Sequence, residues 1–376
     1  MAAAAPAPAL MEEIIEQILI RLPPAEPASL VLAALVCKPW CRLIAGRGFR
    51  RRFREFHRAP PMLGLICNRV DENFYSIYLA RFVPTTCSFR PRRVNRRDWR
   101  ALDARHGRVL LRGMTLAHRH LIVWDPVTKE WIQLPNGPEL VYYWNAAVLC
   151  AAYRSGATCD HLDCHRGPFV VVFLGTSGEH MTLWVYSSEA GAWKKPTSIV
   201  QFPKYHIDES PSAIVGNALY FVIDNSRKIL KYDLATREIS VILQPPASYR
   251  SRRCCTTIMT MEDCGLGVAR MEESRLSLWS MEANLDGGMG WALVRVIDVQ
   301  KLLSVTADSI CYDFLGFAHG AGVLFVGTCD GLFSFDLKTG QARKVCEDQC
   351  HFNGIRGVIP FMSFHTPALG AVSTDD

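Results

Sequence analysis

The sequence predicts a multidomain α+β protein, in which a small N-terminal unit of three helices is followed by a large all-β domain. Apolar residues recur at helical spacing only near the start of the 376-residue chain. From residue 62 onward, short apolar runs alternate with turn-forming residues, which is typical of β-strands. Similar strand–turn–strand units recur along this region. Such internal repeats favour a β-propeller.

The composition is that of a folded protein without a dominant charge. Hydrophobic residues make up 49% and charged residues 21%, and 42 basic against 36 acidic residues give a net charge of +6. This mild excess does not by itself indicate a nucleic-acid partner. The chain has no apolar run of roughly 18 residues, the length needed to span a bilayer, so we expect no membrane contact.

The two ends are expected to be disordered tails, at residues 1–9 and 371–376. The start, MAAAAPAPA, lacks the basic residues and the apolar run of a signal peptide. Without such a signal, the 14 cysteines are expected to be reduced thiols. We therefore expect the protein in the cytoplasm, the nucleus or both.

The first predicted helix lies in LMEEIIEQILIRLPP, residues 10–24. From Leu10 to Leu22 an apolar residue returns at every fourth position, and the glutamates occupy the other side. Pro23 and Pro24 end this helix, because proline lacks the amide donor and its ring clashes with the preceding turn.

A second helix is predicted to begin near Pro27, and a third to run through WCRLIA to the Gly46–Gly48 pair. Pro39 would cost roughly 3 kcal/mol inside one continuous helix. We therefore divide the segment at Val36–Lys38, which places Pro39 in the first turn of the third helix. Three short helices bury too little surface to be stable alone, so a partner is expected to cover an apolar face.

This N-terminal region resembles the F-box motif, and grass-type F-box proteins in particular. The likeness covers residues 10 to about 64 and rests on the acidic amphipathic helix, RLPP, the leucine-rich helix, and CKPW followed by RL. The chain departs from the family at Ala9, Leu10 and Met11, where the family opens with Leu-Pro and an acid. It also departs at Pro39, where the family mostly has a basic or polar residue.

The resemblance implies F-box helices over residues 10–50 and a connecting helix or linker at 51–61. It also implies docking to the small Skp-type adaptor of a ubiquitin ligase, and through it to cullin and RING subunits. By position, the residues expected to form the helical core and the adaptor contact are Leu10, Ile14, Ile18, Pro23, Leu30, Val36, Trp40 and Leu43.

The clearest repeat of the all-β region is LIVWDPVTKEWIQLP, residues 121–135. Asp125-Pro126 favours a tight turn, because the aspartate side chain bonds the backbone ahead and proline fixes its own φ. This unit resembles the turn of the β-propeller domains attached to plant F-box proteins. Related units are centred on Ser187, Asp233 and Asp336, and a looser copy has its turn near Met281. Their spacing is close to the roughly 50-residue kelch period.

An apolar run precedes each of these units, and we expect these runs to be inner strands buried on both faces. They are RVLLRG, FVVVFLG, ALYFVID, GLGVARM and GVLFVGT. The stretch from MLGLICN to YSIYLARFV supplies another blade, and GVIPFMSFHTPAL returns to complete it. We therefore expect a kelch-like propeller over residues 62–370, with six blades rather than seven. A sandwich of two sheets is the alternative.

The densest group of metal-capable residues is CDHLDCHRG, residues 159–167. Zinc sites usually take ligand pairs from two separated segments, and no second pair is evident beside Cys159 and Cys164. We therefore expect an exposed polar loop without a metal. The sequence also lacks the motifs of nucleophilic, phosphate-binding and dinucleotide-binding sites. No catalytic residue and no cofactor is expected.

Arginines concentrate at residues 49–58 and 90–100. Aromatic residues between them would suit single-stranded nucleic acid. The first run, however, fits a connecting helix with Phe49, Phe53 and Phe56 at packing spacing, and the second fits a loop between strands. We expect solvated charged faces and no nucleic-acid binding.

These observations favour a non-catalytic substrate-recognition subunit of a Skp–cullin–F-box ubiquitin ligase. The helices would bind the adaptor and the propeller would hold a target protein, with Tyr142, Tyr143 and Trp144 of the VYYWN stretch as an anchor. The alternative is a propeller enzyme, or a propeller that binds small molecules or nucleic acid, with a helical cap unrelated to ligases.

Overall fold

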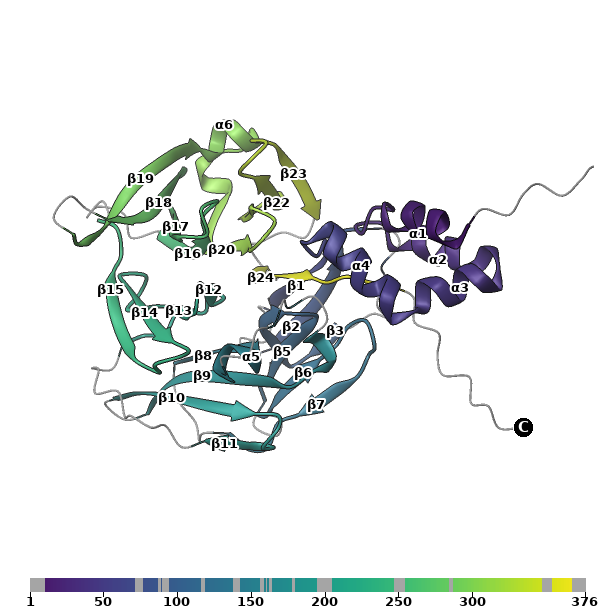
Figure 1. The fold of residues 1–376 in the computed structure, drawn as a ribbon. Helices are drawn as coiled ribbons and strands as arrows, with labels where there is room; N and C mark the ends of the chain where they lie inside the picture. Colours follow the sequence, from purple (N-terminus) through teal and green to yellow (C-terminus); the bar gives the residue numbers. More distant parts are fainter. Residues whose placement is uncertain are drawn as a thin grey trace, which may run out of the picture.

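The computed structural model describes residues 11–71, 77–86, 89, 95–115, 119–137, 143–155, 159, 161, 164–177, 180–194, 205–246, 254–283, 287–346 and 354–366. These residues form an N-terminal group of four helices and six four-stranded antiparallel sheets around an axis (Figure 1). The six-bladed propeller is thus confirmed. The expected three-helix unit is not, because a fourth helix joins it. No helix in the described ranges is long and apolar enough to cross a membrane.

The helices are α1 (Glu12–Ile20), α2 (Pro27–Val36), α3 (Lys38–Ala45) and α4 (Arg47–His57). Between α2 and α3 the backbone of Cys37 is extended, with φ −159° and ψ 161°, and Pro39 lies in the first turn of α3. The predicted break is therefore confirmed. Gly48, expected to help end the third helix, lies inside α4.

Helix α4 belongs to the helical core and is more than a linker. Its Phe49 and Phe53 are each 1% exposed and pack with apolar residues of α1, α2 and α3. Phe364, which follows the last strand, joins the same core, and its ring centroid lies 6.2 Å from that of Phe53. Arg52 of α4 also pairs with Glu16 of α1 at 2.6 Å. The expected boundary at residue 50 therefore cuts through a packed helix.

The third aromatic residue of this helix does not pack as predicted. Phe56 is 53% exposed, and the Arg21 guanidinium lies 5.8 Å from its ring centroid. The second arginine-rich run, residues 90–100, was expected to be a loop, but its described part enters two strands, at 95–97 and from 99 onward. Residues 90–94 lie outside the described residues.

The strands of the first three blades are β1 (Met62–Asp71), β2 (Ile77–Pro84), β3 (Asn95–Arg97), β4 (Trp99–Arg105), β5 (Arg108–Gly113), β6 (Leu121–Trp124), β7 (Trp131–Gln133), β8 (Trp144–Cys150), β9 (Phe169–Ser177), β10 (His180–Ser187) and β11 (Ala192–Lys194). Those of the other three are β12 (Ala213–Val215), β13 (Ala218–Ile223), β14 (Lys228–Asp233), β15 (Ile239–Leu243), β16 (Cys254–Thr260), β17 (Leu266–Glu272), β18 (Arg275–Ala283), β19 (Met289–Asp298), β20 (Ile310–Ala318), β21 (Val323–Thr328), β22 (Gly331–Asp336) and β23 (Ala342–Cys346). Short helices α5 (Ala152–Ser155) and α6 (Val299–Leu303) lie between strands.

The ring is closed by β24 (Ile355–Met362), which pairs with β1 in the order β24–β1–β2–β3. The sequence prediction that the final stretch completes the first blade is confirmed. In the other blades the first strand of the sheet is innermost, and β4, for example, contacts both β24 and β8 of the neighbouring blades. The apolar runs expected inside are the second strands. Among them, β5 and β13 are buried at every position, as predicted.

In three blades, the turn between the third and fourth strands of the blade has the same aspartate geometry. The Asp125 carboxylate accepts backbone N–H bonds from Val127 at 2.7 Å and Thr128 at 3.1 Å. Asp233 accepts the equivalent bonds at 2.9 and 3.0 Å, and Asp336 at 2.9 and 2.8 Å. These bonds confirm the predicted turn chemistry. They lower the pKa of Asp233 below its ordinary value, with the amide of Thr236 as the main cause.

Replacing Asp233 by alanine is expected to lower the free energy of unfolding by about 1 kcal/mol, since two backbone amides lose their acceptor. Asp233→Asn keeps an acceptor oxygen at this place and should lose less. Urea unfolding of both variants measures the difference. Equal losses in the two variants would show that the turn bonds do not stabilise this blade.

Candidate functional site

The N-terminal helices expose a group of large apolar side chains. Helix α2, with the sequence PASLVLAALV, is apolar on all sides, but only part of it packs inward, where Leu30 and Ala33 are buried. Exposed apolar groups of this size typically mark an interaction surface. We call the large apolar residues exposed on α1 and α2 the α1–α2 face; they are Ile14 (43% exposed), Ile18 (52%), Val31 (37%), Leu32 (65%), Leu35 (75%) and Val36 (65%).

The residues predicted for adaptor binding divide between this surface and the helical core. Ile14, Ile18 and Val36 lie on the α1–α2 face, and Pro23 is exposed next to it in the chain. Leu30 is 1% exposed and belongs to the core, while Trp40 and Leu43 are half-buried against that core. Leu10 lies outside the described residues.

Sequence reasoning missed three residues of the face, namely Val31, Leu32 and Leu35. A helix that is apolar all round has no periodicity to show which side is buried. The only available signal was that excess of apolar residues, because a small helical unit cannot bury all of them itself.

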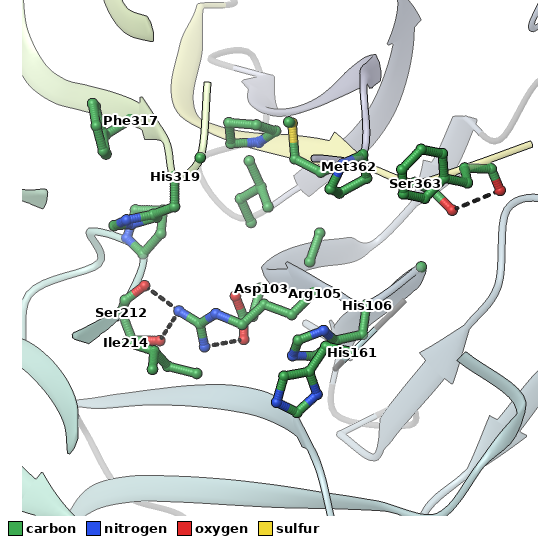
Figure 2. A pocket seen from close by; sticks show the side chains of 18 of the residues that line it. Asp103, Arg105, His106, His161, Ser212, Ile214, Phe317, His319, Met362 and Ser363 are labelled. Carbon is green, nitrogen blue, oxygen red and sulfur yellow. Dashed lines mark hydrogen bonds and ion pairs between the residues drawn. The ribbon is translucent and has the colours of Figure 1, made fainter. Parts of the chain in front are cut away.

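A second candidate site is a partly open cavity of about 350 Å³ at the propeller axis, lined by strand ends and the residues that follow them (Figure 2). Arg54 of α4 and Phe364 also line it, so the helical unit contributes to its wall. Its volume falls within the range of roughly 300–1,000 Å³ typical of ligand pockets. The polar lining includes Asp103, Arg105, His106, Tyr153, His161, Ser212 and His319.

Asp103 and Arg105 link three blades on one side of this cavity. The Asp103 carboxylate accepts hydrogen bonds from the Arg105 guanidinium at 2.7 Å and from the backbone amide of Val148 at 2.8 Å. Arg105 also donates to the hydroxyl of Ser212 at 3.1 Å and to the Ser212 carbonyl oxygen. Burial raises the pKa of Asp103 to about 6, although Arg105 and the Val148 amide act in the opposite direction.

Two of the cavity histidines are held in their neutral form. Burial lowers the pKa of His106 to about 3, with smaller contributions from His161, Arg105 and Arg108. Burial likewise lowers the pKa of His319 to about 3. A general base works best when its pKa is near the working pH, so these rings suit hydrogen bonding better than proton transfer at neutral pH.

Four metal-capable side chains meet beside the cavity. The ligand atoms of Cys150, Cys159, His161 and Cys164 all lie within 4.8 Å of one another. The sequence showed the last three but indicated no second segment that could complete a site. The fourth potential ligand is Cys150, the final residue of β8. It lies outside the sequence pattern that contains the other three, and the fold places it next to them.

The predicted target-binding anchor lies at the start of β8. Trp144 is the first residue of this strand and is half-buried, with the Arg112 guanidinium 3.9 Å from its ring centroid and the Phe173 ring stacked at 6.1 Å. Tyr143 is 39% exposed and lies 4.4 Å from the ring of His206. Tyr142 lies outside the described residues.

Comparisons with known proteins agree with this architecture. The family described as "F-box protein AT5G49610-like, beta-propeller" matches residues 100–369. F-box protein At5g07610 of Arabidopsis thaliana is 22% identical over 322 residues, which cover 80% of this chain and 73% of the relative.

Two solved structures that match the chain have a lower sequence identity to it than this relative has. The extracellular domain of a one-component system from B. thetaiotaomicron has a TM-score of 0.39 at 11% identity, and the match covers 78% of this chain but only 38% of that one. TolB from Acinetobacter baumannii has a TM-score of 0.38 at 11% identity, with 80% and 72% covered. The family match spans more than half of the residues and includes five of the six blades, from β4 onward, together with the closing strand. The chain therefore belongs to the F-box protein AT5G49610-like β-propeller family.

Proposed function

We propose that this protein is the substrate-recognition subunit of a Skp–cullin–F-box ubiquitin ligase. In this role the α1–α2 face binds the Skp-type adaptor, which connects the chain to cullin and RING subunits, and the propeller holds a target protein. The subunit does no covalent chemistry; it raises the local concentration of target lysines near a charged ubiquitin-conjugating enzyme. It would act in the cytoplasm, the nucleus or both.

The observation that carries the proposal is the exposure of the α1–α2 face. Leu32, Leu35 and Val36 are 65%, 75% and 65% exposed on one short helix. Burying such side chains against a partner is favourable by about 25 cal/mol per Å² of apolar surface. Membership of an F-box protein family and the F-box-like sequence of the helices support a Skp-type adaptor as that partner.

Replacing Leu32 or Leu35 by lysine is expected to weaken adaptor binding about 30- to 1,000-fold, the equivalent of 2–4 kcal/mol at a central interface residue. The measurement is the Kd between the full-length chain and a purified Skp-type adaptor. Trp40→Ala is a poorer test, because Trp40 packs against the helical core and its loss would also destabilise the fold.

Leu243→Lys is the matched control, since Leu243 is 70% exposed on β15 of the propeller. Its Kd should equal that of the wild type, and circular dichroism should be unchanged in all three variants. The proposal fails if the wild-type chain does not bind the adaptor, or if Leu35→Lys binds as well as Leu243→Lys.

The axial cavity favours a second candidate function, the binding of a small molecule. Its lining offers the Arg105 guanidinium, the Ser212 hydroxyl and uncharged imidazoles, which suit hydrogen bonding to a small polar ligand. A small-molecule screen for compounds that raise the melting temperature would identify such a ligand. If adaptor binding depends on Leu35, this result supports the ligase role whether or not the screen finds a ligand.

A further inference from the structure

The four metal-capable residues beside the axial cavity form a site that the proposed ligase function does not require. We propose that Cys150, Cys159, His161 and Cys164 bind one zinc ion, which fastens the segment after β8 to the wall of the cavity. The site is structural, and its four ligands all come from this chain.

The spacing of the ligand atoms fits a tetrahedral zinc site. The Sγ atoms of Cys150 and Cys159 are 3.9 Å apart, and Cys164 Sγ lies 3.7 Å from His161 Nδ1. A tetrahedral ion with Zn–S of about 2.3 Å and Zn–N of about 2.0–2.1 Å requires separations of about 3.8 Å between two sulfurs and about 3.6 Å between sulfur and nitrogen. Both observed distances are within about 0.2 Å of these values, and the remaining pairs of ligand atoms lie within 4.8 Å, so binding requires the ligands to move together by about 1 Å at most.

The surrounding residues hold the ligands in place. The buried Arg108 side chain donates to the carbonyl oxygens of Cys164 at 2.7 Å and of Gly167, which anchors the end of the ligand segment to β5. The imidazole of His161 lies 4.5 Å from the ring of Tyr153 and 4.5 Å from that of His106. Figure 2 shows His106 and His161 next to each other on the same side of the cavity. Such outer contacts fix a ligand's orientation before the metal binds.

The donor set selects the kind of metal. Three thiol sulfurs and one imidazole nitrogen are soft ligands that suit zinc and do not suit calcium or magnesium, which prefer oxygen. Four protein ligands fill a tetrahedron, so no position remains for water or substrate, which is the arrangement of structural rather than catalytic zinc. A disulfide is a poorer explanation, because 3.9 Å is far from the S–S bond length of about 2.05 Å.

The position of the site explains what the ion would do. Cys150 ends an innermost strand, whereas Cys159, His161 and Cys164 belong to the connection between β8 and β9. His161 and Tyr153 from this connection line the cavity. An ion would tie the connection to the strand end and so define this side of the cavity.

The full-length chain, purified without chelator, is expected to contain one zinc per molecule by elemental mass spectrometry. Cobalt(II) in place of zinc should give the visible absorption of a tetrahedral site and sulfur-to-metal charge transfer. Cys159→Ser and Cys164→Ser should each weaken zinc binding by more than about 100-fold, since even outer-contact losses cost 10- to 100-fold. Cys264→Ser is the matched control, because Cys264 is an exposed thiol between β16 and β17, and it should keep one zinc.

His161→Cys separates loss of a ligand from loss of the fold. Four thiolates should still bind the metal, and the charge-transfer band of the cobalt form should become stronger in proportion to the added thiolate. The inference is overturned if the folded wild-type chain contains no zinc and gives no tetrahedral cobalt spectrum. It is also overturned if Cys159→Ser binds zinc as tightly as Cys264→Ser. Neither result depends on adaptor binding.

Discussion

A chain that ends at Cys346, and therefore lacks β24, is expected to lose the cooperatively folded propeller. β24 is the inner strand of the first blade and pairs along most of the length of β1, for example Leu65 with Pro360 and Ile66 with Ile359. It also contacts β4 and β20 of the two neighbouring blades. Without β24, the edge of β1 is unpaired and the ring is open. The neighbouring blades that contain β4 and β20 then lose the strand that packs against them.

The buried side chains of β24 indicate how much the free energy of unfolding would fall. Phe361 is 1% exposed and packs in the core of the first two blades, where its ring stacks on that of Phe89 with centroids 6.2 Å apart. Phe361→Ala alone is expected to cost about 3–5 kcal/mol. Three further side chains of this strand, Ile355, Val358 and Ile359, are exposed by 3% or less. The free-energy cost of removing the whole strand is therefore expected to exceed the free energy of unfolding of an ordinary domain, about 5–15 kcal/mol.

The matched control is a chain that ends at residue 366, which keeps β24 and Phe364. It should show the circular dichroism and the urea midpoint of the wild type, whereas the chain ending at Cys346 should show no cooperative transition. A synthetic peptide of residues 354–366 should restore part of the transition by pairing with β1. A cooperative transition at the wild-type midpoint in the shorter chain would refute the role assigned to β24.

Local chemistry made the blades predictable from the sequence. Asp125, Asp233 and Asp336 each bond the two amides ahead of them, so the recurring aspartate is the direct cause of the turn. The break at Cys37 was predictable for the same reason, because Pro39 is tolerated only in the first turn of a helix. Both features depend on neighbours in sequence.

The closure of the ring by β24 was predicted, but other features that depend on distant parts of the chain were not. Cys150 is an ordinary buried strand residue in the sequence, and only the end of β8 places it beside Cys159. The axial cavity is lined by the ends of several blades, none of which carries a motif. The exposed side of α2 depends on how α1, α3 and α4 pack around it, and the helix itself has no apolar period.

The second large effect is expected at Asp103. Asp103→Ala should lower the free energy of unfolding at neutral pH by about 3–5 kcal/mol, the usual cost of removing one partner of a buried ion pair. The carboxylate is 3% exposed and ties β4 to β8 through the amide of Val148 at 2.8 Å. Its removal leaves Arg105 without its carboxylate partner and the Val148 amide without an acceptor. Urea unfolding measures the loss.

The burial of Asp103 also predicts a pH dependence that distinguishes this residue from the other titratable groups of the cavity. Burial raises the pKa of Asp103 in the folded chain to about 6, whereas an unfolded aspartate titrates near about 3.9. Between these values the folded state binds the proton more tightly. The stability that the protonated carboxyl contributes is therefore fully present below about pH 4 and is lost as the pH rises through about 6.

The wild-type stability minus that of Asp103→Asn should thus increase by on the order of 2–3 kcal/mol when the pH is lowered from 7 to 4. His106 and His319 act in the opposite direction, because burial lowers the pKa of each to about 3. Their contribution to the free energy of unfolding is lost as the pH falls below the pKa of an unfolded histidine. Both chains carry these histidines, so the subtraction removes most of their effect. A difference that stays constant from pH 7 to pH 4 would show that Asp103 is ionised throughout this range. The link between β4 and β8 would then be a permanent ion pair that does not respond to pH.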